Sequence, residues 1–222
     1  MNMQEFIDNW LPLFPQAIKE TFQMVVISLF FSVIIGVILA ILLILTRPGQ
    51  PLQNKFVYQT LNLLINVIRS IPFIILLFFM LPFTKLLVGV TIGVKGVIVP
   101  LVVNAAPYIA RLIESSLLEV NQGVIEAYRA MGIKTHQIIW NVMLREARPA
   151  IILALTIATI SIIGATAMAG LVGAGGLGDL AYRFGHLRYE ADVMYVTVIL
   201  LIIIVQGVQS IGNRLAERMK KD

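Results

Sequence analysis

Side chains that commonly carry chemistry are sparse in this chain. Its 222 residues include no cysteine and two histidines, so disulfides, zinc–thiolate sites and cysteine nucleophiles are excluded. His136 and His186 lie in separate polar segments, which the topology argued below places on opposite sides of a membrane. No G-x-x-x-x-G-K-[ST] pattern for binding nucleotide phosphates occurs. We therefore expect no catalytic site, no metal site and no cofactor on this chain.

One glycine run resembles a cofactor motif by its letters. Residues 173–178, G-A-G-G-L-G, fit the G-x-G-x-x-G dinucleotide pattern. That pattern has meaning only between a strand and a helix of a βαβ unit, and here it follows an uncharged apolar stretch. We interpret it instead as a tight, irregular turn in which glycine supplies unusual backbone angles.

The composition sets the class of protein that must position these residues. The chain is 59% hydrophobic and 13% charged, with a mean hydropathy of +0.90, whereas soluble domains are roughly 45–50% apolar and about 25% charged. A soluble core cannot hold this excess, so a bilayer is the expected solvent. The net charge of +5 is dispersed between apolar stretches, which argues against nucleic-acid binding.

The apolar stretches predict an all-α membrane protein with five transmembrane helices. Crossing the hydrocarbon takes about 20 apolar residues at about 1.5 Å each. The third stretch is the weakest, because charged residues lie near both of its ends. The expected spans are 21–46, 56–84, 86–118, 149–171 and 193–213.

Basic residues predict the orientation of these spans. With the N-terminus outside, 11 of the 17 lysines and arginines fall in cytoplasmic segments and five fall outside, with Arg69 inside the second span. Cytoplasmic loops carry the excess of positive charge, so we expect an N-out, C-in topology. It leaves residues 1–16 outside and 213–222 as a cytoplasmic tail. We expect Arg69 to lie near the inner interface or to pair with a carbonyl.

A polar segment, 121–140, interrupts the apolar spans on the expected cytoplasmic side. Asn121 is suited to cap a first helix, and Gly132 is suited to end it in a left-handed conformation. Thr135 is suited to cap a second helix. The segment therefore predicts two short helices joined at a glycine corner, with an ordinary loop as the alternative.

The same segment resembles a family motif. Residues 126–132, E-A-Y-R-A-M-G, followed by the L-R-E-A-R-P of 144–149, are similar to the EAA loop of ABC importer permeases. Tyr128 replaces the usual second alanine, and Arg145 stands where a proline is usual. The resemblance implies coupling helices that sit in a groove of a cytoplasmic ATPase. The coupling residues it implies are Glu126, Ala127, Ala130, Gly132 and Thr135.

Four further segments narrow the resemblance to permeases of bacterial methionine importers. They are TRPGQ (46–50), RSIPFIILL (69–77), AAPYIARLIESSLLEV (105–120) and GAGGLGDLAYRFG (173–185). The resemblance covers residues 17–212 and implies a type I ABC importer transmembrane domain in a multi-pass protein of the bacterial cytoplasmic membrane. It also implies as partners a second copy of the chain, an ATPase dimer that holds ATP and Mg, an external amino-acid-binding protein and membrane lipid.

The glycine run has two functional interpretations within that family. Gly173, Gly175, Gly176 and Gly178 would contact the external binding protein or close an outer gate. A simple tight turn explains the same residues equally well.

Two helical faces are candidates to line a solute pathway. The third span carries polar residues and prolines spaced by four, three, four and three, which places them on one stripe. Its members are Pro100, Asn104, Pro107, Arg111 and Glu114. Ser161, Gly164 and Met168 share a face of the fourth span. We take Asn104, Ser161 and Met168 as pathway or gate candidates, with helix packing as the alternative.

Other functions stay open at this point. A permease for another amino acid would share most of these motifs. An ion-coupled secondary carrier is disfavoured because spans one, four and five hold no Asp, Glu, Lys, Arg or His and no internal repeat is evident. A membrane scaffold would not depend on ATP. Co-purification of an ATP-hydrolysing chain would separate these possibilities.

Overall fold

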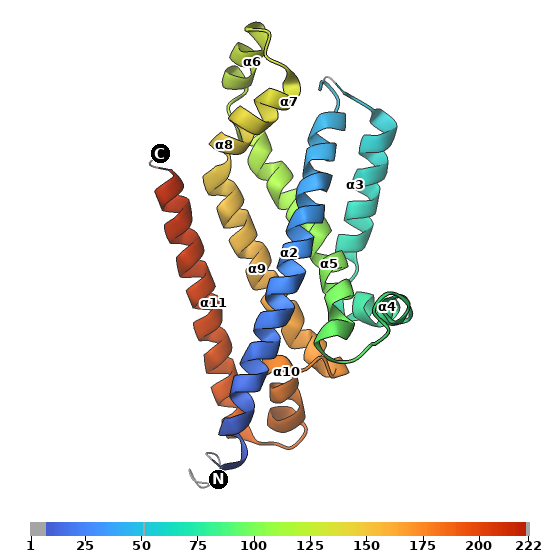
Figure 1. The fold of residues 1–222 in the computed structure, drawn as a ribbon, viewed down its shortest axis with the longest axis vertical. Coiled ribbons are helices and arrows are strands. Elements are labelled where there is room, and N and C mark those ends of the chain that lie inside the picture. Colours follow the sequence, from blue (N-terminus) through green and yellow to red (C-terminus); the bar gives the residue numbers. More distant parts are fainter. Residues whose placement is uncertain (1–7, 51, 221–222) are drawn as a thin grey trace.

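The computed structural model describes residues 8–50 and 52–220, which form helices and connecting turns and include no β-strand. Figure 1 shows long helices running side by side, with the short helices α6, α7 and α8 gathered at one end and α10 near the other. The long elements are α2 (Phe14–Thr46), α3 (Lys55–Ser70), α4 (Phe73–Val88), α5 (Gly93–Leu118), α9 (Arg148–Ala169) and α11 (Ala191–Met219). The short elements are η1 (Leu11–Leu13), α6 (Gln122–Ala130), α7 (Thr135–Ile138), η2 (Ile139–Met143), α8 (Leu144–Glu146), η3 (Gly170–Val172), α10 (Gly176–Leu180) and η4 (Ala181–His186).

Four of the five expected spans are single membrane-length helices among the described residues. By length and hydropathy these are Leu11–Thr46, Gly93–Leu118, Arg148–Val172 and Ala191–Met219. The first begins earlier than residue 21. A proline lies in its first turn, and the helix tolerates it there because an N–H at that position would have no hydrogen-bond partner within the helix. The third begins at Gly93 rather than 86, because residues 86–88 belong to α4 and Gly89 ends that helix with φ of 82°.

The expected second span over 56–84 is broken in the structure. This segment forms α3 and α4, which meet at an angle of 107°, and Figure 1 shows α4 lying across the bundle below α3. The break falls at Ile71, whose extended backbone (φ −86°, ψ 122°) precedes Pro72. Proline disfavours the helical conformation in the residue before it, so the sequence S-I-P stops α3.

Helix α5 is the centre of the bundle and packs against α2, α9, α4 and α3. Its contact with α2 is close because α2 carries a buried stripe of small residues at intervals of four: Ser28, Ser32, Gly36 and Ala40. A Cβ on Gly36 would lie 2.7 Å from the Cγ2 atom of Ile109. Small residues of this kind let membrane helices approach closely.

Candidate functional site: a coupling loop and a polar seam

The polar segment 121–140 folds as two short helices, as its sequence predicts. The Asn121 side chain accepts a hydrogen bond from the N–H of Gly123 (2.8 Å), and Gly132 adopts φ of +76°. After the corner, the backbone N–H of Ile133 bonds to the carbonyl of Tyr128 (3.2 Å), which satisfies a carbonyl of the last turn. Thr135 is the first residue of α7 rather than its cap, a difference of one residue in the boundary.

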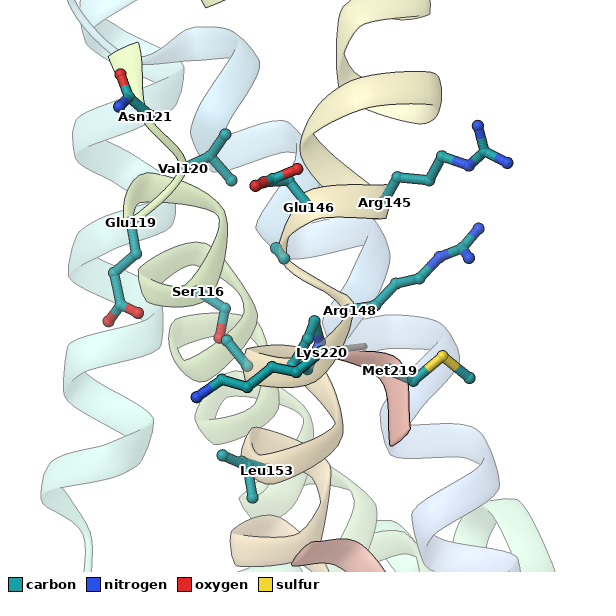
Figure 2. A pocket seen from close by; sticks show the side chains of 13 residues that line it. Ser116, Glu119, Val120, Asn121, Arg145, Glu146, Arg148, Leu153, Met219 and Lys220 are labelled. Carbon is teal, nitrogen blue, oxygen red and sulfur yellow. The ribbon is translucent and has the colours of Figure 1, made fainter. Parts of the chain in front are cut away.

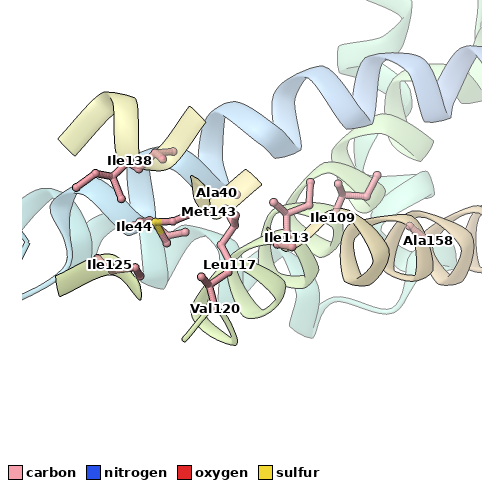
Figure 3. Packing of buried hydrophobic residues seen from close by; sticks show 12 residues of the cluster. Ala40, Ile44, Ile109, Ile113, Leu117, Val120, Ile125, Ile138, Met143 and Ala158 are labelled. Carbon is pink, nitrogen blue, oxygen red and sulfur yellow. The ribbon is translucent and has the colours of Figure 1, made fainter. Parts of the chain in front are cut away.

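A buried cluster anchors this helix pair to the long helices. Ile125, Ile138 and Ile139 are each at most 4% exposed and pack with Ile44 and Leu117. Figure 3 shows Ile125 and Ile138 in one cluster with Ile44. Burying an aliphatic side chain stabilises by about 1.5–3 kcal/mol, so the three isoleucines fix α6, α7 and the start of η2 on the bundle.

The predicted coupling residues lie together on the outer side of that pair. Glu126, Ala127, Ala130 and Gly132 are exposed, and Thr135 is half-buried. Arg129 also ties α6 to the turn after α2, because its guanidinium donates a hydrogen bond to the Gln50 side chain (2.7 Å). An apolar underside and an exposed face of small residues form a surface that a partner can approach.

A pocket of about 1040 Å³ opens beside the coupling helices. It lies between the end of α5, the turn from α8 to α9 and the end of α11 (Figure 2). Its ionic lining has both signs, with Glu119 and Glu146 against Arg145, Arg148 and Lys220. Figure 2 shows Arg145 and Arg148 extending to the same side. The mixed charge selects no single class of ligand.

The predicted stripe on α5 faces the protein interior. Pro100, Pro107 and Glu114 are buried, and Asn104 and Arg111 are half-buried. Arg111 forms an ion pair with Glu114 (2.6 Å). The same guanidinium donates to the side-chain oxygens of Asn62 (2.6 Å) and Asn66 (3.2 Å) of α3. These bonds join α5 to α3 through polar groups rather than through apolar packing alone.

Sequence reasoning missed the residues of α3 that meet this stripe. Its polar residues recur at intervals of four and three and so share one face; they are Lys55, Gln59, Asn62, Asn66, Arg69 and Ser70. All are exposed except the half-buried Asn62. The polar residues recur with the 3.6-residue period of an α-helix, but this pattern is hidden when hydropathy is averaged over the whole stretch 56–84.

We call the contact between these two faces the polar seam, and it contains Arg69. The seam consists of Asn62, Asn66 and Arg69 of α3 with Asn104, Tyr108 and Arg111 of α5. The Arg69 guanidinium carbon lies 5.8 Å from the centre of the Tyr108 ring. Within the described residues, no carbonyl pairs with Arg69, contrary to one of the two placements expected for it.

The two pathway candidates on α9 lie on an open face of that helix. Ser161 is exposed and Met168 is 50% exposed, with Gly164 between them also exposed. Asn104, on α5, is half-buried. The structure therefore leaves two of the three pathway candidates exposed, both on α9.

The glycine run is packed more deeply than a surface turn. Gly176 and Gly178 are buried, Gly175 is half-buried and Gly173 is exposed. A Cβ on Gly178 would lie 2.3 Å from the carbonyl oxygen of Ala167. Of the four glycines, only Gly173 and Gly175 therefore have surface free for an external partner.

Helix α2 holds the start of α10 through two side chains. The Glu20 carboxylate accepts a hydrogen bond from the N–H of Gly176 (2.7 Å), and the Thr21 hydroxyl accepts from the N–H of Leu177 (2.9 Å). The first N–H groups of a helix have no partner within it. These acceptors, 156 residues away in sequence, supply the missing partners.

Comparison with known proteins identifies the class. The family model of binding-protein-dependent transport system inner membrane components matches residues 32–221, and the chain belongs to this family. It is thus a transport component rather than an enzyme, as the sequence predicts.

Individual relatives are similar over most of their lengths. The chain is 44% identical over 200 residues to the probable D-methionine transport system permease protein MetI of Vibrio cholerae, covering 90% of this chain and 89% of that protein. It is 45% identical over 180 residues to the methionine import system permease protein MetP of Bacillus subtilis, covering 81% of each.

Solved structures give the same fold. A chain of the MetNI methionine ABC transporter in an inward-facing conformation superposes with a TM-score of 0.93 at 44% identity, over 99% of both chains. This match confirms the predicted type I importer fold. A chain of an amino acid ABC transporter crystallised with histidines superposes with a TM-score of 0.81 at 18% identity, which shows the shared fold alone.

Proposed function

We propose that this chain is the permease subunit of an ATP-driven methionine importer in the bacterial cytoplasmic membrane. The observation that carries the proposal is the 44% identity over 90% of the chain to a probable D-methionine permease. A structural match at the same identity, to a methionine ABC transporter, supports it.

The chain would work as a homodimer with two separate ATPase chains. In a single copy, the polar face of α3 and the face of α9 that carries Ser161 and Met168 are exposed. A second copy would enclose a pathway between its own exposed faces and these. ATP and Mg would be held by the ATPase. An external amino-acid-binding protein would deliver the solute to the end of the bundle that carries α10.

Coupling would pass through the exposed face of α6 and α7. Glu126, Ala127, Ala130, Gly132 and Thr135 would contact the ATPase, as the resemblance to the EAA loop implies. Because Ile125 and Ile138 pack in the core that includes α2 and α5 residues, movement of the helix pair would be transmitted directly to the long helices.

Uptake by vesicles tests the substrate. The permease, its ATPase and its binding protein are reconstituted together, and labelled methionine uptake is measured with and without ATP. We expect ATP-dependent uptake that unlabelled methionine competes and that arginine and glutamate do not. Uptake of a charged amino acid with no response to methionine would reject the substrate but keep the permease assignment.

A further inference from the structure

The two arginines of the polar seam differ in whether neighbouring residues neutralise their positive charge. Arg111 is paired with the buried Glu114 and bonded to two asparagine side chains. Arg69 lies further along the same face of α3, and among the described residues no carboxylate or hydrogen-bond acceptor meets it. One cation of the seam is therefore neutralised by the protein, and the other is left for a partner that the single chain does not contain.

Arg69 lies part-way along the length of the bundle, on an exposed face of α3. Helix α3 starts at the end of the molecule that carries α6 and α7 and runs along the side of the bundle (Figure 1), and Arg69 is in its last turn. Arg69 lies 14 positions after Lys55, which is about 21 Å of helix. A charged residue at such depth is costly unless it faces a partner or water, and it marks a solute pathway by default.

The surrounding face of α3 supports a water-filled environment. Gln59, Asn66, Arg69 and Ser70 are exposed on that face, and polar groups turned toward lipid would have no hydrogen-bond partner. The opposite side of α3 exposes apolar residues such as Leu64, 53% exposed, which suits lipid. Helix α3 thus has separate lipid and polar faces, and Arg69 lies on the polar one.

The N–H donors of Arg69 have no hydrogen-bond partner among the described residues. Its guanidinium carbon lies over the Tyr108 ring, 5.8 Å from the ring centre, a distance at which the cation is attracted by the ring without using those donors. Those donors match a carboxylate with two parallel hydrogen bonds. Asn104 lies one turn before Tyr108 on the same face of α5 and is half-buried.

We propose that Arg69 binds the carboxylate of the amino acid as it passes through the permease, with Tyr108 as its positioning residue. This inference rests on the proposed function, because it assigns a site within the same pathway. One uncompensated cation matches a solute with one carboxylate and an apolar side chain. The site would make the permease itself selective for a carboxylate, beyond any selection by the binding protein.

The test uses the complete reconstituted importer and three variants. Arg69→Gln removes the positive charge. Arg69→Lys keeps the charge but loses the guanidinium, which can donate two parallel hydrogen bonds to a carboxylate. The control, Lys85→Gln, removes a cation from the last turn of α4, outside the seam. Losing a charge-assisted hydrogen bond costs about 1.5–3 kcal/mol, which is roughly a tenfold to hundredfold effect. At saturating loaded binding protein we expect maximal methionine uptake to fall about tenfold or more in Arg69→Gln, less in Arg69→Lys, and to stay near wild type in Lys85→Gln.

A binding measurement without the binding protein separates a solute contact from a structural role. Labelled methionine bound to the purified permease–ATPase complex is competed with unlabelled methionine or with methioninol, which lacks the carboxylate. We expect the wild type to prefer methionine as competitor and Arg69→Gln to lose that preference, with normal co-purification of the ATPase.

Three outcomes would overturn the inference. One is normal uptake by Arg69→Gln in a system whose wild type transports methionine. Another is loss of the permease dimer in Arg69→Gln with normal uptake per remaining dimer, which would assign Arg69 to contacts between copies. The third is absence of methionine uptake by the wild type, which would reject the proposed function and this inference together.

Discussion

At the scale of single residues, glycines serve two physical purposes in this chain. At Gly132 the backbone has φ of +76°, and an added Cβ would meet nothing within 4 Å. At Gly178 the backbone is helical, but an added Cβ would lie 2.3–2.7 Å from backbone atoms of Ala167. The first glycine is required by conformation and the second by the closeness of two helices.

These two purposes predict unequal effects of alanine. Gly132→Ala should cost about 1–2 kcal/mol, because a left-handed residue with a Cβ is strained by that amount. Gly178→Ala should cost more, because Ala167 is backbone and cannot turn aside. Thermal unfolding of the purified complex measures both. Gly207→Ala, where α11 has open space, should be neutral or slightly stabilising, and equal losses in all three variants would contradict this distinction.

At the scale of elements, the connection between α2 and α10 carries a prediction. Removing an acceptor from a buried N–H costs about 1–3 kcal/mol. Glu20→Ala frees the N–H of Gly176 and Thr21→Val frees that of Leu177, so each should lower the midpoint of thermal unfolding. Glu20→Gln keeps one carbonyl acceptor and should lose less. Gln23→Ala, on an exposed part of the same helix, is the control, and a loss equal to that of Glu20→Ala would reject the cap.

Elements also show what the sequence could and could not predict. The long apolar helices and the corner at Gly132 follow from local composition and from one glycine between two helix-forming stretches. The break at Ile71 and Pro72 was missed because hydropathy averaged over 56–84 hides the polar face of α3. The bonds from Glu20 and Thr21 to α10 join residues 156 apart in sequence, and a single sequence contains no local signal for them.

The pathway candidates show the same limit. Asn104 was found because its stripe on the third span is regular. Arg69 was noticed as a lone charge, and its position near the inner interface stays a prediction. Its neighbours on α5 could not be found from the sequence, because that face becomes visible only when α3 and α5 pack together. The coupling residues stay a prediction, because their contact lies on a chain that this structure does not contain.

At the scale of the whole molecule, the arrangement of the ends argues for an orientation. The described chain begins at one end of the bundle, near α10, and α11 runs toward the end that carries α6, α7 and α8 (Figure 1). Of the 17 basic residues, 11 belong to segments at the α6–α8 end or to the C-terminal tail in the proposed topology. Positive charge is retained on the cytoplasmic side, so the tail and the coupling helices should both lie inside.

A reporter fusion checks this orientation. Alkaline phosphatase, which is active only outside the cytoplasm, should be silent when fused after Asp222 and active when fused in the turn after α4, at Gly89. A fluorescent protein that matures only in the cytoplasm should show the reverse pattern at the same two positions. Strong phosphatase activity at Asp222 would show that the orientation is the opposite one. Inversion would place Glu126 and Gly132 outside the cell, where no ATPase is available, and would reject the coupling assignment together with the topology.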